Sequence, residues 1–168
     1  VEGFYLLLTY VDILTLERFR PPDEVAVYYA AARILAVVAF VHFAIAGATT
    51  HKFTQYHVEG DHQRLAKFFA ETIHWTFWPS LAACALILAL GIPLLSLFGA
   101  GFTAGYAVMF ILAVGMMARA AAGPAERLLL MLGDRKQCAS VYAIAFAINL
   151  AGCVLLIPPL GIEGAGIA

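Results

Sequence analysis

The sequence predicts an all-α, polytopic transmembrane helix bundle with about five spans and the start of a sixth. The first observation is composition: the 168-residue chain is 63% hydrophobic and only 12% charged, whereas soluble domains average about 45–50% apolar and about 25% charged residues. The second is a series of long apolar segments, each near the roughly 20 residues that cross a bilayer. The third is that prolines, glycines and charges gather between those segments.

The first two predicted spans, 4–16 and 25–50, flank the polar stretch ERFRPPDE. Span 4–16 ends where Pro21 and Pro22 interrupt a helix. It is short, as if its beginning were missing, so we expect the chain to be a piece of a longer protein. The acidic residues of PDE precede span 25–50, where a helix N-terminus favours negative charge.

The third predicted span, 68–90, follows the longest polar stretch, HKFTQYHVEGDHQRLAK at 51–67. We expect this stretch to be a loop, with Asp61 as the N-cap of a helix that leads into the span. Gly91 and Pro93 loosen the far end of the span, and the glycine-rich FGAGFTAGY that follows predicts a tight turn.

The fourth predicted span, 106–132, is interrupted by Gly123 and Pro124, which could be a flexing point or a static kink. The polar turn GDRKQ separates it from the fifth span, 138–157. Two prolines and a glycine then break the helix. A further helix is expected to begin at about residue 162.

The distribution of basic residues predicts the orientation, because cytoplasmic loops carry more lysine and arginine. Two loops that should share one side hold five such residues, Lys52, Arg64, Lys67, Arg135 and Lys136. The loops on the other side hold two, Arg18 and Arg20. The turns at 51–67 and 133–137 are therefore predicted to be cytoplasmic.

Other function classes have little support in the sequence. The net charge of −1, with no basic block, argues against nucleic-acid binding. No HExxH, GxSxG or P-loop motif occurs, so we do not expect an enzyme. The five histidines form no i, i+4 pair, and we predict no metal or cofactor. The cysteines, Cys84, Cys138 and Cys153, lie in apolar runs without CxxC spacing and are interpreted as small hydrophobic residues.

Ionisable residues inside predicted spans are the candidate functional residues, since they are costly in hydrocarbon and usually face a wet cavity or one another. Arg33 and Arg119 are the deepest cations, and Asp12 is a third candidate for a cavity wall. Pairing is the alternative, joining Arg33 to Asp12 or Arg119 to Glu126. For Glu126 we favour pairing, because it is seven residues from Arg119 on the same helix face.

Three uncharged polar residues complete the candidates. Asn149 lies within the fifth span, where an interhelical hydrogen bond is more common than a substrate contact. Tyr28 and Tyr29 lie near the start of the second span. We favour a position in the interfacial aromatic belt for both tyrosines over stacking on a sugar.

Four local patterns, in this order, give the chain a family resemblance. They are YVDILTLERFRPPDEVAVYYAAARIL, with V-x-x-Y-x-x-A-x-x-(K/R); LLSLFGAGFTAGY; AAGPAERLLLMLGDRKQ, similar to G-P-x-x-x-L-L-x-M-x-G; and NLAGCVLLIPPLGIEGAGIA, similar to N-x-x-x-N-x-x-L-I-P-x-x-G-x-x-G-A-x-x-A. The chain thereby resembles the oligosaccharidyl-lipid flippases of the multidrug/oligosaccharidyl-lipid/polysaccharide exporter superfamily. Cys153 stands where that pattern often has a second Asn, Glu126 where Gly is usual, and His51 near a frequent Pro.

The resemblance implies a fold and a function. It implies two six-helix halves around a central cavity that opens alternately to each face. Residues 1–168 would form a partial C-terminal lobe, helices seven to eleven and the start of the twelfth, which joins a missing N-terminal lobe. The implied function is to move a polyprenyl-diphosphate-linked oligosaccharide across the bacterial inner membrane for O-antigen or other surface polysaccharide. Arg33, Arg119, Asp12 and Asn149 would line the substrate cavity, among membrane lipids.

Three alternatives stay open at this point. A drug or ion-coupled exporter of the same superfamily would favour an aromatic, acid-lined cavity, whereas the deep charges here are mainly arginine. A membrane glycan polymerase or ligase would need a large outer loop with acid and base residues, and the longest polar loop predicted here is short and cytoplasmic. A scaffold that shares the fold without transporting is less favoured, because the polar residues of the cavity are intact.

Overall fold

The computed structural model describes residues 2–131 and 135–168, with side chains for 10–45, 47–49, 51–56, 58–123, 125 and 139–168. Every element among these residues is helical, which confirms the all-α prediction. The elements are α1 (Glu2–Phe19), α2 (Pro22–Ala36), α3 (Ala39–Val58), α4 (His62–Ala89), α5 (Gly91–Ser96), the 3₁₀ helix η1 (Ala100–Gly105), α6 (Tyr106–Met131), α7 (Arg135–Leu160) and α8 (Ile162–Ile167).

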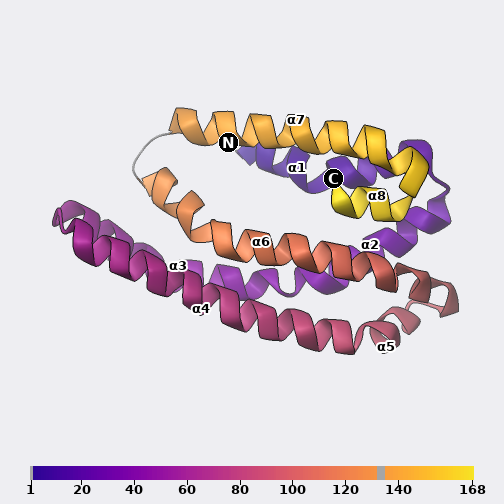
Figure 1. Ribbon diagram of the computed structural model, residues 1–168, viewed down its shortest axis with the longest axis horizontal. Helices are drawn as coiled ribbons and strands as arrows, with labels where there is room; N and C mark the ends of the chain where they lie inside the picture. Colours follow the sequence, from indigo (N-terminus) through magenta and orange to yellow (C-terminus); the bar gives the residue numbers. More distant parts are fainter. Residues whose placement is uncertain (1, 132–134) are drawn as a thin grey trace.

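The helices form two packed groups (Figure 1). α1, α7 and α8 lie together, while α3 and α4 pack on each other and on α6. α2 and α6 also contact α8, and so they join the two groups. The turns after α1, α4 and α7 lie at one end of the bundle, and the α3–α4 turn lies at the other (Figure 1). This alternation is what consecutive antiparallel spans require.

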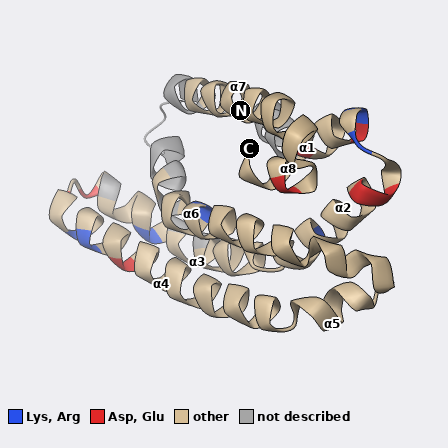
Figure 2. Ribbon diagram, turned by 45° about the vertical axis from the view of Figure 1, so that its right-hand side comes forward, with Lys and Arg blue, Asp and Glu red and all other residues tan. Residues whose placement is uncertain are grey.

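Four described stretches are long and apolar enough to cross a membrane: Pro22–Tyr56, His62–Ala89, Ala100–Gly123 and Ala139–Leu160. The first of these combines α2 and α3. The earliest predicted span, 4–16, falls within α1. Charged residues gather at the two ends of the bundle and leave the described middle almost entirely uncharged (Figure 2). Such a distribution fits helices that cross a hydrocarbon layer.

The second predicted span is broken, which the sequence did not indicate. α2 ends at Ala36 and α3 begins at Ala39. Between them the backbone adopts i→i−3 hydrogen bonds: Val38 N–H donates to Leu35 O at 2.9 Å and Val41 N–H donates to Val38 O at 3.1 Å. Neither proline nor glycine marks this site, so the residues that usually signal a break are missing. A 3₁₀ stretch inside a helix is a frequent position for a hinge.

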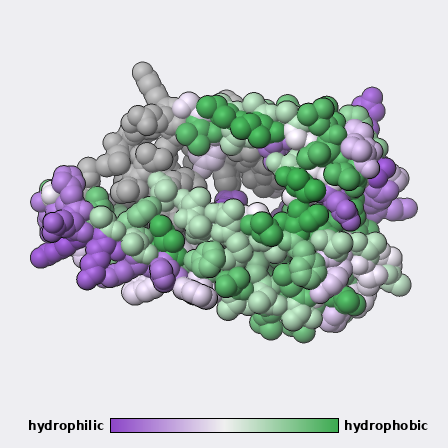
Figure 3. Space-filling view, viewed as in Figure 1, coloured by the Kyte–Doolittle hydropathy of each residue, from purple (hydrophilic) through white to green (hydrophobic). Residues whose placement is uncertain are grey.

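The prediction that 51–67 is a loop is wrong, because the chain there is a helical hairpin. α3 continues to Val58, and α4 begins at His62 after a turn at Gly60, whose φ is +70°. The predicted N-cap is confirmed: the Asp61 carboxylate accepts a hydrogen bond from Arg64 N–H at 2.9 Å. Polar side chains therefore mark where the helices leave the apolar layer, and they do not mark where the helices end. Hydrophilic side chains cover this end in Figure 3.

The hairpin has a small aromatic core of its own. Phe53 is only 2% exposed, and its ring lies 5.0 Å from the ring of Phe68 in an edge-on arrangement. Tyr56 contacts the same Phe68 ring at 5.7 Å, and the Lys52 ammonium lies 5.6 Å above it. Edge-to-face pairs of this kind add to the burial of apolar area. They explain how α3 and α4 stay helical beyond the apolar segments.

The glycine-rich FGAGFTAGY forms the 3₁₀ helix η1 where a tight turn was expected, and the short helix α5 precedes it. α4 stops at Leu90, and Gly91 then packs under Tyr106. A Cβ atom on Gly91 would lie 2.7 Å from the Tyr106 ring. The Tyr106 hydroxyl donates to Leu88 O at 3.2 Å. This contact holds the end of α4 against the start of α6.

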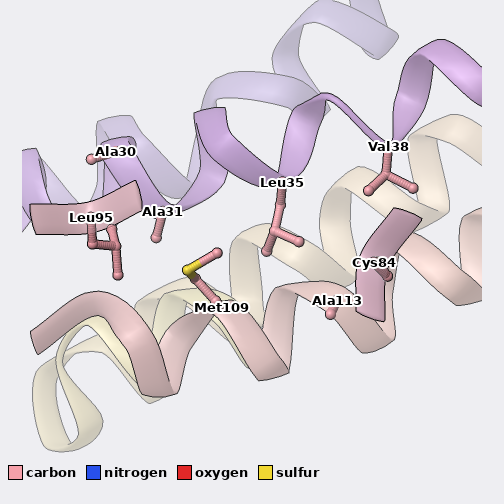
Figure 4. Packing of buried hydrophobic residues seen from close by; sticks show 8 residues of the cluster. All are labelled: Ala30, Ala31, Leu35, Val38, Cys84, Leu95, Met109 and Ala113. Carbon is pink, nitrogen blue, oxygen red and sulfur yellow. The ribbon is translucent and has the colours of Figure 1, made fainter. Parts of the chain in front are cut away.

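Two buried clusters hold the helices together, and small residues recur in both. Figure 4 shows the first cluster, in which Met109 of α6 points toward Ala31 and Leu35 of α2. The full cluster is Ala30, Ala31, Leu35, Val38, Cys84, Leu95, Met109 and Ala113. The second cluster is Leu16, Tyr28, Val108, Cys153, Ile157 and Ala165. Cys84 and Cys153 are free and buried, as their interpretation as small hydrophobic residues predicts, whereas Cys138 lies outside the described side chains.

The orientation remains a prediction that labelling can test. In the complete protein, with its own cysteines replaced by serine, a cysteine at Gly60 should resist an impermeant thiol reagent added to intact cells. A cysteine at Ala104, at the opposite end of the bundle, should react at once, because basic residues hold the Gly60 end in the cytoplasm. Disrupted cells are the control, since both positions should then react. Labelling of Gly60→Cys alone in intact cells would reverse the orientation.

Candidate functional site

A cavity of about 740 Å³ opens in the described part of the bundle, between the two helix groups. All four residues predicted to line a substrate cavity lie in its wall: Asp12 from α1, Arg33 from α2, Arg119 from α6 and Asn149 from α7. They are separated by up to 137 positions in the chain and meet only through the fold. In the space-filling view the molecule is hollowed between the α7 side and the α6 side (Figure 3).

Arg33 lies on an aromatic support. Its guanidinium carbon lies 4.8 Å from the centroid of the Tyr29 ring. The same guanidinium interacts with the side chain of Tyr10 from α1. Tyr29 is one helical turn before Arg33, so the ring lies directly beneath the charge. This cation–π contact, with side-chain hydrogen bonds to Tyr29 and Tyr10, holds the guanidinium at the cavity edge, and its five N–H donors outnumber these two partners.

The alternative considered for Arg33, a pair with Asp12, is wrong, since no salt bridge joins these two described side chains. The Asp12 carboxylate instead accepts a hydrogen bond of 2.5 Å from the Tyr28 hydroxyl. Ile13 N–H donates to the same carboxylate at 2.9 Å. A short hydrogen bond to an ionised acceptor is among the stronger polar contacts in proteins. Tyr28 therefore satisfies Asp12 and leaves Arg33 to other partners.

Tyr28 does not lie in an aromatic belt, which corrects that expectation. It is only 1% exposed, and its hydroxyl also lies 3.5 Å from Ala165 O in α8. The phenol ring thus joins α1, α2 and α8 beneath the cavity floor. Its neighbour Tyr29 is 43% exposed and supports Arg33. Adjacent residues of a helix point about 100° apart, so Tyr28 is buried at the cavity wall while Tyr29 lines a separate hollow between α1 and α2.

Arg119 lines a second, much smaller cavity of about 10 Å³ as well, together with His42 of α3 and Ser80 of α4. The absence of a side chain at Gly123 makes room for His42, because a Cβ there would lie 2.8 Å from the imidazole Nδ1. The side chain of Glu126, the predicted partner of Arg119, lies outside the described residues, so that pairing stays a prediction. Gly123 lies within the continuous helix α6.

His42 is the residue in the site that the sequence interpretation missed. It is an ionisable side chain within a predicted span, which is the signal that selected Arg33 and Arg119. From the sequence, His42 was considered only as one of five histidines, which lack the i, i+4 spacing of a metal site. Its position beside Arg119 places an imidazole next to the cation on α6.

Asn149 reaches the cavity from α7, and its described hydrogen bond is within the same helix. Its Oδ1 accepts from the Cys153 thiol at an S···O distance of 3.6 Å. Cys153, which stands where the family pattern often has Asn, is fully buried one turn further along. The amide of Asn149 keeps its N–H donors available toward the cavity.

The chemistry of the wall is that of an amphipathic binding site. Two guanidinium groups, one carboxylate and one amide line the space among the described residues, and apolar side chains surround them, among them Phe40, Phe43, Leu112 and Met116. Within the described residues no three His, Cys, Asp or Glu side chains gather in a way that could hold a metal. The break between α2 and α3 lies in this wall, since Val37 and Ala39 line it.

The MatE family model matches residues 3–155 of the 168-residue chain. No curated protein and no solved structure matches the chain.

Proposed function

Because this chain belongs to the MatE family, whose members are membrane transporters, we propose that it is part of a flippase for polyprenyl-diphosphate-linked oligosaccharides. The chain is a multi-pass membrane transporter segment of the multidrug/oligosaccharidyl-lipid/polysaccharide exporter superfamily. The finer proposal is that the transporter moves its substrate from the cytoplasmic to the outer leaflet of a bacterial inner membrane. It would thereby supply surface polysaccharide biosynthesis.

The observation that carries the proposal is that Arg33 and Arg119 line one cavity. Guanidinium groups bind phosphate oxygens through paired N–H donors, and they stay charged in any environment that a protein provides. A diphosphate offers several anionic oxygens, which suits two cations on different helices. Arg33 is already supported by Tyr29, so little side-chain freedom is lost when it binds.

The other lining residues fit the remaining chemistry of such a lipid. Phe40, Phe43 and Met116 offer apolar surface next to the arginines, where the first isoprene units of a polyprenyl chain could lie. Asp12, the one carboxylate among the described lining residues, is already bound by Tyr28. A cationic drug would need a carboxylate free to pair with it, so the charge balance of this wall favours an anionic substrate over such a drug.

The partners follow from the same proposal. The cavity is open, and we infer that the N-terminal lobe of the complete protein supplies its opposite wall. Lipid-linked oligosaccharide and membrane lipids are the other partners. The break at Val37–Val38 lies beside the arginines, where a small change in backbone angle would alter the cavity.

Reconstitution of the complete protein into liposomes tests the proposal. We expect it to move polyprenyl-diphosphate oligosaccharides, extracted from cells that produce the protein, to the opposite leaflet, where an added glycosidase can reach them. It should not accumulate ethidium, a cationic substrate typical of drug export, because the described lining residues include two cations, and their one carboxylate, Asp12, is bound by Tyr28. The double variant Arg33→Ala/Arg119→Ala should lose flipping, and Lys52→Ala on the α3–α4 hairpin should keep it. Ethidium transport without flipping would favour the drug exporter instead.

A further inference from the structure

A further hollow of about 550 Å³ lies between α1 and α2, toward the end of the bundle where these two helices meet. Its polar and aromatic lining residues are Glu17 of α1, Arg20 in the turn after α1, and Tyr29 of α2, and Ile13, Pro22, Val25 and Ala26 complete it. We call it the α1–α2 groove. Its volume is in the range of about 300–1,000 Å³ that small-molecule sites occupy.

Helix geometry joins this groove to the cavity. Residues 22, 26, 29 and 33 of α2 recur at spacings of three and four, so they form one stripe along the helix. Tyr29 lines the groove, and Arg33, directly above it, lines the cavity. Residues 10, 13 and 17 form the matching stripe on α1, Arg20 follows just after the helix end, and Tyr10 of this stripe interacts with Arg33. The two stripes thus present a continuous surface from the Arg33 guanidinium to the end of the bundle.

Charge indicates that this surface faces water and not lipid. Glu17, Arg20 and Arg33 all lie on it. Charged side chains that face hydrocarbon are costly, so a stripe with three of them is expected to line an aqueous path. Arg20 forms a salt bridge of 3.1 Å with Glu24. Glu17 has no such partner among the described side chains, so its carboxylate stays available in the groove.

We propose that the α1–α2 groove is a glycan subsite, which binds the first sugars of a lipid-linked oligosaccharide while Arg33 holds the diphosphate. This inference rests on the proposed function. The exposed part of the Tyr29 ring offers an apolar face to the C–H groups of a sugar, and the Glu17 carboxylate accepts hydrogen bonds from its hydroxyl groups. Ala26, seven residues before Arg33, lies about 10 Å along the helix from it. The groove therefore begins within reach of a sugar linked to the bound phosphate.

Tyr29 has two roles in this arrangement, since one ring supports the guanidinium and lines the groove. Substitution of Tyr29 would therefore disturb both sites at once. Glu17 and Ala26 are the better positions for a test, because neither touches Arg33 in the structure. Glu17→Gln removes the charge at nearly constant shape. Ala26→Phe fills the groove.

The experiment measures binding to the complete, purified protein in detergent with two probes. One is bare polyprenyl diphosphate, and the other is the polyprenyl-diphosphate oligosaccharide fraction from cells that produce the protein. We expect the sugar-bearing lipid to bind about tenfold more tightly than the bare lipid. Glu17→Gln and Ala26→Phe should each remove most of that difference and leave the affinity for the bare lipid unchanged. The matched controls, Glu71→Gln and Ala85→Phe on exposed positions of α4, should change neither affinity.

Three outcomes of the binding experiment distinguish the glycan subsite from the proposed function on which it rests. If the two variants lose sugar-dependent affinity alone, the glycan subsite is supported. If both probes bind but the variants keep the full tenfold preference, the α1–α2 groove is not the glycan subsite, and the proposed function stands. If neither probe binds to the unmodified protein, the proposed function fails and the subsite fails with it.

Discussion

Replacing Arg33 by alanine in the complete protein should abolish glycan export while the protein still inserts into the membrane. The physical reason is that its guanidinium faces the cavity and is held there by Tyr29 and Tyr10, not by a carboxylate. Loss of a charge-assisted hydrogen bond to a phosphate should weaken binding of the diphosphate lipid about 10- to 100-fold. Surface glycan and protein abundance measured in parallel give the two readouts.

Arg33→Lys separates charge from shape at this position. A lysine still attracts phosphate but lacks the planar fork, and it is expected to keep part of the activity. Lys52→Ala is the matched control, because this cation lies over an aromatic ring as well, on the α3–α4 hairpin far from the cavity. Normal glycan export from a well-expressed Arg33→Ala protein would remove Arg33 from the mechanism.

The hydrogen bond between Tyr28 and Asp12 changes the result expected from a double replacement of Arg33 and Asp12. A buried Arg33–Asp12 pair would make each single replacement destabilising and the double replacement tolerable. Because Asp12 is bound by Tyr28 and not by Arg33, the double variant should gain no such rescue. Asp12→Asn should behave instead like a change at the α1–α2–α8 junction, with lower protein levels independent of Arg33.

The sequence predicted the features of the fold that have a compositional or local signature, and it did not predict those that have none. Composition and apolar length predicted the helices, since a bilayer allows few alternatives for such segments. Asp61 was found because a cap has a local signature. The break at Val37–Val38 has none, as its neighbours are all good residues for a membrane helix. The hairpin at 51–67 was taken for a loop because polarity was equated with the end of a helix.

In the candidate site, the sequence predicted the charged residues but not the contacts that they make. The cost of charge in a membrane selected Arg33, Arg119 and Asp12 without knowledge of the fold, and the structure places them around one cavity. Their partners could not be predicted, because Tyr28 reaches Asp12 only through the packing of α1 against α2. The α1–α2 groove could not be predicted either, because Glu17 and Arg20 belong to a polar stretch that was interpreted as the connection between two spans.

Among the described glycines, Gly164 is the one whose replacement by alanine should lower the stability of the protein most. α7 reverses into α8 at Gly161, whose φ is +64°, and the two helices then approach closely. A Cβ on Gly164 would lie 2.5 Å from the carbonyl carbon of Leu156 and 3.0 Å from the backbone N of Ile157. Backbone atoms cannot move aside as a flexible side chain can. Overpacking of this kind is expected to cost about 3 kcal/mol or more.

Gly47→Ala is the matched control for Gly164→Ala, because a Cβ on Gly47 in α3 would meet nothing within 4 Å. Alanine is the better helix former by about 0.8–1 kcal/mol, so this variant should be neutral or stabilised. The readout is the amount of monodisperse complete protein in detergent and its melting temperature. Since α8 carries Ala165, whose carbonyl receives the Tyr28 hydroxyl, displacement of α8 should also loosen the Asp12 site. A Gly164→Ala protein that purifies and melts like the unmodified one would show that α7 and α8 are not packed as closely as described.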